Sequence, residues 1–303
     1  MIQFAFAGVL LAIGTVTGSL VPGPSLEACK AESDQKLKVA NCTEVIRSDA
    51  YYGTELAIAY YNRGRAREAL GERRKAIADY DEALVIDPGL TAVYLFRARA
   101  QARLGRHELA VADFGRLIER DPYLAAAYQG RAASLASLGM HERAVNDYDR
   151  TLEFEPANAE VFFRRGMSLY RLDRYRAAVE SSGQALRLDP ENPRAHNERA
   201  WILYRLGRHA EALRDARAAL RQLPGAAPVI DTHAHVLAAL GRRDEALAEF
   251  ERAIEAGGAR YVRMYQKALV GHGLYEGEVN GVYGPELRGA IADCLAAGCE
   301  LLQ

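Results

Sequence analysis

The side chains best suited to chemistry are four cysteines, which fall into two local pairs. Cys29 and Cys42 form one pair, and Cys294 and Cys299 form the other. Paired thiols either form disulfides or bind a metal such as zinc, usually together with histidine. No histidine lies near either pair at ligand spacing. We therefore predict two local disulfides, Cys29–Cys42 and Cys294–Cys299, with the other two pairings as alternatives.

A second candidate is the segment Asp231-Thr232-His233-Ala234-His235, which resembles the metal motif of amidohydrolases. In that motif the two histidines lie on a β-strand, where alternate residues point to the same side. Here the segment falls inside a predicted helix, and residues two apart on a helix do not share a face. No nucleophile with a nearby base and no phosphate-binding glycine loop occurs. We predict no metal, no cofactor and no enzymatic activity.

A 34-residue period runs through residues 57–260. Its six ungapped segments begin at Ala57, Thr91, Ala125, Ala159, Pro193 and Ala227. Each segment has Gly or Ala at its eighth place and Ala at its twentieth, while five have Gly at the fifteenth and five have Pro at the thirty-second. Small residues let two helices approach closely, Gly ends the first helix, and Pro stops the second.

This pattern resembles the tetratricopeptide repeat, in which each repeat is a pair of helices. The resemblance implies an all-α solenoid, a right-handed superhelix of helix hairpins, over residues 57–260. It also implies that the ligand is a protein or a peptide.

Residues 34–48 resemble an orphan second helix of the same repeat, because Lys38–Ile46 align with Ala76–Leu84. The ends of a solenoid need such a covering element. Residues 27–56 are therefore predicted to be a capping half-repeat. A Cys29–Cys42 disulfide would tie the incoming chain onto this cap.

Two ladders of opposite charge share the period. The seventh place holds Arg63, Arg97, Arg131, Arg165, Arg199 and His233, and the twenty-third holds Asp79, Asp113, Asp147, Ser181, Asp215 and Glu249. We predict arginine–carboxylate pairs that set the register of the helices. An anion-binding strip is the alternative. Arg165 faces Ser181 in this register, so we expect it to be free to meet a ligand.

The first helices of this family line a groove, and aromatic residues with arginine gather at the corresponding places of segments four and five. These residues are Phe163, Arg164, Met167, Tyr170, Arg171, Asn197, Trp201, Tyr204 and Arg205. Arg65 and Arg99 continue the groove in the first two segments. Aromatic and arginine side chains dominate binding hot spots, so we predict the partner-binding surface here. For any single ring, packing against the next repeat is the alternative.

The period stops at Gly257-Gly258, and a different pattern follows. It consists of Tyr265-Gln266, Leu269, Gly273, Tyr275, Gly277, Gly281, Tyr283, Gly284 and Pro285. This resembles the peptidoglycan-binding domain of bacterial cell-wall hydrolases. The resemblance implies a small helical module over residues 261–303, with Tyr275, Asn280 and Tyr283 at the glycan. Leu287 replaces an expected Thr, and a Phe-Gln pair is missing. The alternative is therefore a disulfide-closed cap that has lost the ligand.

Location is predicted from the leader and the cysteines. Residues 1–26 contain no charged side chain and include the apolar run Phe4–Ile13. This layout is typical of a signal peptide. No Lys or Arg precedes the run, so an uncleaved N-terminal anchor is the alternative. We expect export to the periplasm or cell envelope.

The net charge of −1 gives no overall field for nucleic acid or an anionic membrane. Membrane contact is expected only if the leader stays uncleaved. The combined expectation is an envelope scaffold that binds a protein or peptide in its groove and touches peptidoglycan. The alternatives are a pure interaction module with a degenerate C-terminal cap and, less favoured, a cell-wall enzyme.

Overall fold

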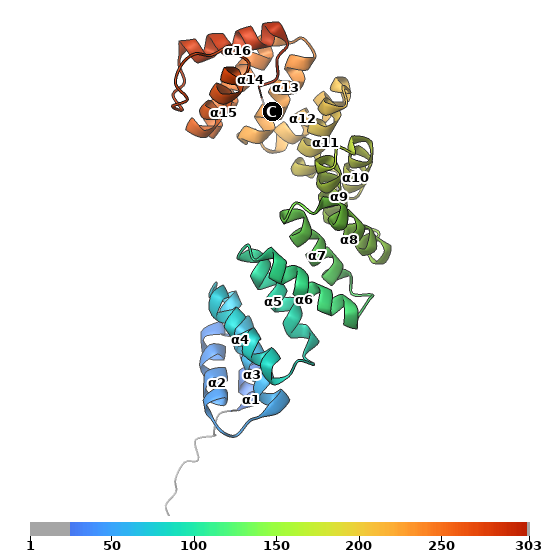
Figure 1. The fold of residues 1–303 in the computed structure, drawn as a ribbon, viewed down its shortest axis with the longest axis vertical. Helices are drawn as coiled ribbons and strands as arrows, with labels where there is room; N and C mark the ends of the chain where they lie inside the picture. The colour runs from blue at the N-terminus through green and yellow to red at the C-terminus, as the bar shows by residue number, and fades with distance from the viewer. Residues whose placement is uncertain (1–24, 302–303) are drawn as a thin grey trace, which may run out of the picture. The chain divides into compact units, whose positions relative to one another are not determined.

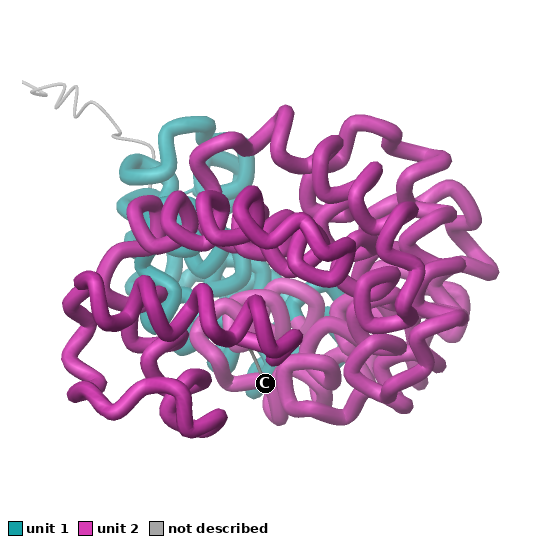
Figure 2. The backbone as a smooth tube through the Cα atoms, turned by 90° about the horizontal axis from the view of Figure 1, so that it is seen from above, with its two compact units in different colours: residues 1–93 teal, residues 94–303 magenta. Residues whose placement is uncertain are grey.

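This computed structural model describes residues 25–301 of the chain. These residues form sixteen α-helices joined by turns and contain no strands (Figure 1). The predicted leader falls almost wholly on residues 1–24 and so lies outside the described part. Two compact units divide the chain, residues 1–93 and residues 94–303, and each is described by itself (Figure 2).

The first unit contains four helices: α1 (Leu26–Ala31), α2 (Gln35–Arg47), α3 (Gly53–Ala69) and α4 (Arg73–Ile86). The helix α2 packs against α3 and coincides with the predicted orphan helix. A disulfide between Cys29 and Cys42 joins α1 to α2 as predicted. Both sulfurs are fully buried beside Val45 and Ala59. The helix α2 thus packs on the first helix of the first repeat, and α3 begins four residues before the period does.

Five further hairpins follow, beginning with α5 (Thr91–Arg103), which starts at the end of the first unit. The remaining helices of these five hairpins are α6 (His107–Arg120), α7 (Ala125–Ser137), α8 (His141–Phe154), α9 (Ala159–Arg171), α10 (Tyr175–Leu188), α11 (Pro193–Arg205), α12 (His209–Gln222), α13 (Ala227–Ala239) and α14 (Arg243–Gly257). The segment with His233 and His235 is helical, as predicted.

The turn between the two helices of a repeat requires a left-handed residue. Gly207, for example, has φ 74°. Asp173, the one exception to glycine at this place, adopts φ 56° and is the only non-glycine residue with positive φ among residues 25–301. Its carboxylate accepts a hydrogen bond from the Tyr175 hydroxyl at 2.5 Å. Asp tolerates this conformation better than most residues, so the turn survives the substitution.

The predicted ladder of ion pairs is present. In four repeats the arginine pairs with an aspartate 16 residues later, at 2.6 or 2.7 Å: Arg63–Asp79, Arg97–Asp113, Arg131–Asp147 and Arg199–Asp215. Each pair joins the two helices of one repeat, and the aspartates are buried.

The prediction of a free Arg165 is wrong. Its Nε donates to Asp149 Oδ1 at 2.6 Å. Asp149 lies in α8 of the preceding repeat, so this bond links two neighbouring repeats. Ser181, which replaces the aspartate, instead donates its hydroxyl to the Phe162 carbonyl at 2.8 Å.

The last two helices, α15 (Ala259–Gly271) and α16 (Pro285–Ala297), share a hydrophobic core with the sixth repeat. Leu237 and Phe250 of the repeat meet Tyr265, Ile291 and other apolar side chains of the C-terminal segment. The second predicted disulfide, Cys294–Cys299, closes the turn after α16. The C-terminal segment therefore covers the apolar end of the repeat array, as a solenoid cap does.

Candidate functional site

A cavity of about 610 Å³ lies among the first helices of repeats four to six. We call it the Trp201 cavity. The helices α9, α11 and α13 line it from the repeats, and α15 closes it with Tyr261 and Met264. The residues from α9 and α11 are Phe163, Met167, Tyr170, Arg171, Arg194, Asn197, Glu198, Trp201 and Ile202.

The aromatic side chains of the cavity are fixed by contacts between repeats. Trp201 Nε1 donates to the Tyr170 hydroxyl at 2.7 Å, which joins α11 to α9. The Trp201 ring also meets the edge of His235 from α13, with 5.5 Å between ring centroids. Phe163 is buried under the Arg194 guanidinium, which lies 5.2 Å from the ring centroid. Rigid rings of this kind give a ligand a large contact area at low entropic cost.

Two oxygen atoms in the cavity are buried and accept no hydrogen bond from residues 25–301. They are Asn197 Oδ1 and Glu198 Oε2, which come from adjacent residues of α11. The other carboxylate oxygen of Glu198 accepts from Ser182 Oγ at 3.3 Å. Burial raises the pKa of Glu198 to about 8. An acid with so high a pKa holds its proton at neutral pH unless a cation approaches it.

A second acid, Asp231, is buried at the α13 side of the cavity. It accepts a hydrogen bond from the Tyr265 hydroxyl of α15. Burial raises the pKa of Asp231, and the neighbouring His235 opposes this rise. Tyr265 satisfies Asp231 within the protein, whereas Glu198 Oε2 has no hydrogen-bond partner among residues 25–301.

Six of the eleven predicted groove residues line the Trp201 cavity. They are Phe163, Met167, Tyr170, Arg171, Asn197 and Trp201. Arg99 and Arg164 instead line a separate cavity of about 520 Å³ at repeats two to four. Arg65 lies in the first unit, with its guanidinium 5.8 Å from the centroid of the Tyr61 ring.

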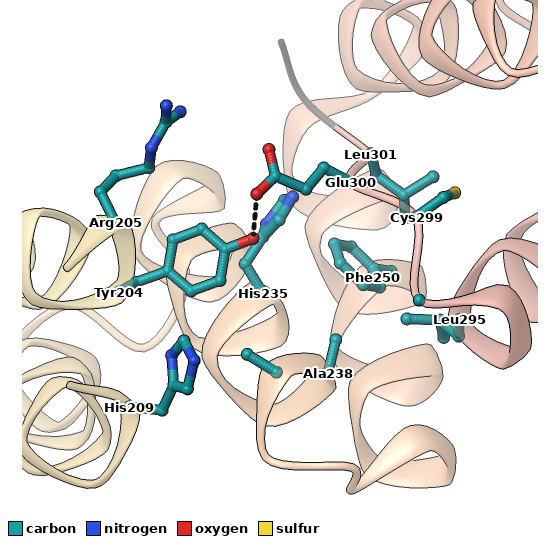
Figure 3. Close-up of a pocket in the computed structure, with 12 residues that line it drawn as sticks. Tyr204, Arg205, His209, His235, Ala238, Phe250, Leu295, Cys299, Glu300 and Leu301 are labelled. Atoms are coloured by element: carbon teal, nitrogen blue, oxygen red, sulfur yellow. Dashed lines mark hydrogen bonds between the residues drawn. The ribbon is translucent and has the colours of Figure 1, made fainter. Parts of the chain in front are cut away.

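Tyr204 and Arg205 line a third cavity, of about 390 Å³, together with His209 and His235 (Figure 3). The Tyr204 hydroxyl donates to Glu300 Oε1 at 3.2 Å. Glu300 belongs to the segment that follows α16, and its backbone carbonyl lies 2.8 Å from His272 Nε2. These two residues therefore face a cavity that the segment after α16 helps to line, rather than the Trp201 cavity.

The sequence did not single out Arg194, Glu198, Tyr261 or Met264. Arg194 and Glu198 occupy the second and sixth places of the fifth segment, and the second place is one that the family uses for its groove. Tyr261 and Met264 lie beyond the period, where no register assigns a residue to the groove. Their contribution depends on how α15 packs against the sixth repeat.

The three residues predicted to meet glycan hydrogen-bond within the protein. Gln266 is fully buried, and its Nε2 donates to the Tyr275 hydroxyl at 3.2 Å and to Asn280 Oδ1 at 3.1 Å. The Tyr283 hydroxyl donates to Glu251 Oε1 of α14 at 2.6 Å. Gln266 thus organises the loop between α15 and α16.

No group of three or more His, Cys, Asp or Glu side chains within residues 25–301 is arranged to hold a metal ion. In the same part of the chain, none of the helices has the length and apolar character that crossing a membrane would require.

Comparison with known families matches the tetratricopeptide repeat at residues 57–90, 91–123, 163–227 and 228–256. These matches and the helix hairpins show that the chain is a tetratricopeptide-repeat protein. Among curated proteins, none matches the sequence.

Solved structures share the fold. A tetratricopeptide repeat protein from Parabacteroides merdae aligns over 79% of this chain and 98% of its own, with 18% identity and a TM-score of 0.64. MamA from Desulfovibrio magneticus aligns over 55% of this chain and 93% of its own, with 19% identity and a TM-score of 0.53. YrrB, described as having an unusual peptide-binding site, aligns over 58% and 91%, with 22% identity and a TM-score of 0.51.

Proposed function

We propose that this chain is a scaffold that holds a peptide or an extended segment of a partner protein in the Trp201 cavity. The observation that carries the proposal is the cavity itself. Aromatic and apolar side chains from three repeats and α15 converge there, with buried oxygen atoms that lack partners. Ligand sites are typically concave, mostly apolar and provided with a few polar groups that orient the ligand. YrrB, a tetratricopeptide-repeat protein with an unusual peptide-binding site, shares this fold, which is consistent with such a use.

The proposed role is binding rather than catalysis. Two acids line the cavity, Glu198 and Asp231. Ser182, whose hydroxyl donates to Glu198 at 3.3 Å, is fully buried and does not line the cavity, so a ligand there does not reach it. A nucleophile and a base within hydrogen-bond reach are the signature of covalent catalysis. The rival function is a cell-wall enzyme. A clearing band for the purified protein in a peptidoglycan zymogram would favour that rival.

The site of binding is tested by photocrosslinking in cells. A photoreactive amino acid replaces either Met167, which lines the cavity, or Met140, which does not. These side chains are almost equally exposed, at 43% and 44%. We expect discrete adducts from position 167 that a Trp201→Ala substitution removes, and none of these adducts from position 140. The same adducts from both positions would overturn the proposal.

We further propose that the protein acts outside the cytoplasm, in the bacterial envelope. The two disulfides, Cys29–Cys42 and Cys294–Cys299, support this, because such bonds persist in oxidising compartments. The uncharged apolar leader supports it as well. Mass spectrometry of the protein from fractionated cells is the test. We expect intact disulfides in the envelope fraction, and a mass that shows whether the leader is removed. Recovery in the cytoplasm with free thiols would contradict export.

A contact with peptidoglycan is a secondary proposal. It is favoured by the loop held around Gln266, which exposes Val279 and Val282. Co-sedimentation of the full chain with purified sacculi tests it. A Val282→Ser substitution should reduce sedimentation, whereas Val270→Ser on the exposed side of α15 should not. Absence of sedimentation would leave the C-terminal segment as a cap on the repeats alone.

A further inference from the structure

The Trp201 cavity presents acceptors that have no donors. Glu198 Oε2 and Asn197 Oδ1 are each buried without a hydrogen-bond partner in the described chain. A buried polar atom left unpaired costs about 1–3 kcal/mol, and more when it is charged. Both atoms come from one turn of α11 and line the same cavity. A ligand that supplies donors at this point would remove both penalties.

The charged groups around Glu198 leave it without an ion pair. Arg194 of α11 and Glu160 of α9 are the charged groups that act on it, with opposite effects on its pKa. On the side of α10, only the Ser182 hydroxyl contacts it, at 3.3 Å. Arg194 is exposed and stacks on Phe163, and no ion pair to Glu198 within 4.0 Å is found between the described residues. Arg194 thus favours the ionised carboxyl group only from a distance, and no cation among the described residues contacts Glu198 directly.

The cavity beside Glu198 has walls that suit a long basic side chain. Gly166 of α9 packs closely behind the Glu198 carboxyl, since a Cβ there would lie 3.1 Å from Glu198 Oε1, so a ligand approaches from the cavity side. Trp201 and Phe163 supply ring surfaces beside the acid, and Met167 adds a flexible apolar side chain. The methylene stem of Lys or Arg packs on such apolar surfaces while its charged head reaches the acceptors.

We infer that the partner segment inserts a Lys or Arg side chain between Trp201 and Phe163, where Glu198 and Asn197 accept its hydrogen bonds. This inference rests on the proposed function and names the chemical class of its ligand. The raised pKa of Glu198 is consistent with it, because a bound cation restores the charged form that burial disfavours.

An acidic ligand is the main competitor, because Arg171 and Arg194 also line the cavity. Both arginines are exposed, so water and salt already stabilise them. The unpaired Glu198 oxygen is shielded from water, so a ligand satisfies it only when the Glu198 side chain turns toward the cavity. A ligand carboxylate has no hydrogen-bond donor, so it would leave Asn197 Oδ1 unpaired.

The test uses synthetic nonapeptide pools with acetylated and amidated ends, so that no terminal charge contributes. One central position is fixed as Lys, Arg, norleucine or Glu, and the flanking positions are mixtures of Leu, Phe, Tyr, Val and Ser. Binding to the full-length protein is measured by displacement of a dye-labelled Lys-fixed pool. Glu198→Gln keeps the shape of the side chain. Glu180→Gln, on the exposed side of α10, removes the same charge elsewhere.

We expect the Lys and Arg pools to bind at least about tenfold more tightly than the norleucine pool, since a charge-assisted hydrogen bond contributes about 1.5–3 kcal/mol. Glu198→Gln should abolish this preference, and Glu180→Gln should preserve it. Equal binding of Lys and norleucine, or tighter binding of Glu, would overturn the inference. If no pool binds, or binding survives Trp201→Ala, the proposed function itself fails.

Discussion

Trp201 Nε1 donates a hydrogen bond to the Tyr170 hydroxyl at 2.7 Å, across a separation of 31 residues. The bond joins the first helices of two successive repeats at the wall of the cavity. It holds the only tryptophan of the chain in one orientation. The geometry of the candidate site and the register of its repeats therefore depend on each other.

Tyr170→Phe should weaken the contact between α9 and α11 at the cavity. The substitution removes the acceptor of the Trp201 bond and keeps the ring, so the free energy of unfolding should fall by about 1 kcal/mol. Trp201 emission should shift to longer wavelength as the indole gains contact with water. Urea unfolding followed by fluorescence measures both effects. Tyr52→Phe, at a side chain that is 82% exposed, is the control. Identical behaviour of the two variants would contradict the role given to the bond.

The ion-pair ladder predicts unequal effects for two arginines. Arg131→Ala leaves the buried carboxylate of Asp147 without its bidentate partner. This should destabilise the protein by about 3–5 kcal/mol. Arg165→Ala breaks a pair with Asp149, whose side chain is 46% exposed, and should cost about 1 kcal/mol or less. Chemical denaturation of both variants tests the difference. Similar losses in the free energy of unfolding for the two variants would contradict the larger structural role given to the buried pairs.

Two glycines in neighbouring helices should respond oppositely to a methyl group. A Cβ added at Gly130 of α7 would lie 2.3 Å from Phe114 Cζ, so Gly130→Ala should destabilise the protein by about 1–3 kcal/mol. A Cβ added at Gly115 of α6 would lie 4.0 Å from its nearest neighbour, Arg131 Nη1. Gly115→Ala should stabilise the protein by about 0.5–1 kcal/mol, because Gly weakens a helix interior. Thermal melts compare the two, and destabilisation by Gly115→Ala would show an unrecognised clash.

Glu198 should make stability depend on pH. Its pKa is near 4.5 in an ordinary setting and about 8 in the folded chain. The folded state therefore binds more protons between these values, so this contribution to stability is complete below about pH 4.5 and is lost as the pH rises towards about 8. Glu198→Gln removes the dependence. The melting temperature of the Glu198→Gln protein minus that of the unsubstituted protein should be larger at pH 8.5 than at pH 5. The same difference at both pH values would contradict the burial of the acid.

The sequence predicts the repeats well because each hairpin is built from local requirements. Small residues at the helix contact, a left-handed turn and a proline stop recur every 34 residues, so the hairpins follow from spacing alone. The four ion pairs, each within one repeat, follow too. In each pair, as in Arg131–Asp147, the arginine and the aspartate stand at fixed places of the period.

Contacts outside the period could not be predicted in the same way. Arg165 reaches Asp149 because Ser181 leaves it without a partner in its own repeat. Tyr204 stands at the same place of its repeat as Tyr170, yet it meets Glu300 and lines another cavity. Tyr261 and Met264 enter the Trp201 cavity only through the packing of α15 on the sixth repeat. Each of these contacts depends on tertiary packing between segments that no repeat register relates.

The most direct test of peptide binding in the Trp201 cavity compares Met167→Ala with Met140→Ala. The tightest single peptide from the pools is titrated into each protein, and Trp201 fluorescence follows binding. We expect a saturable change at Trp201, an affinity about five- to tenfold weaker for Met167→Ala through lost apolar contact, and native affinity for Met140→Ala. Saturable binding measured by calorimetry without any change at Trp201, or equal affinities of the two variants, would contradict binding at this site.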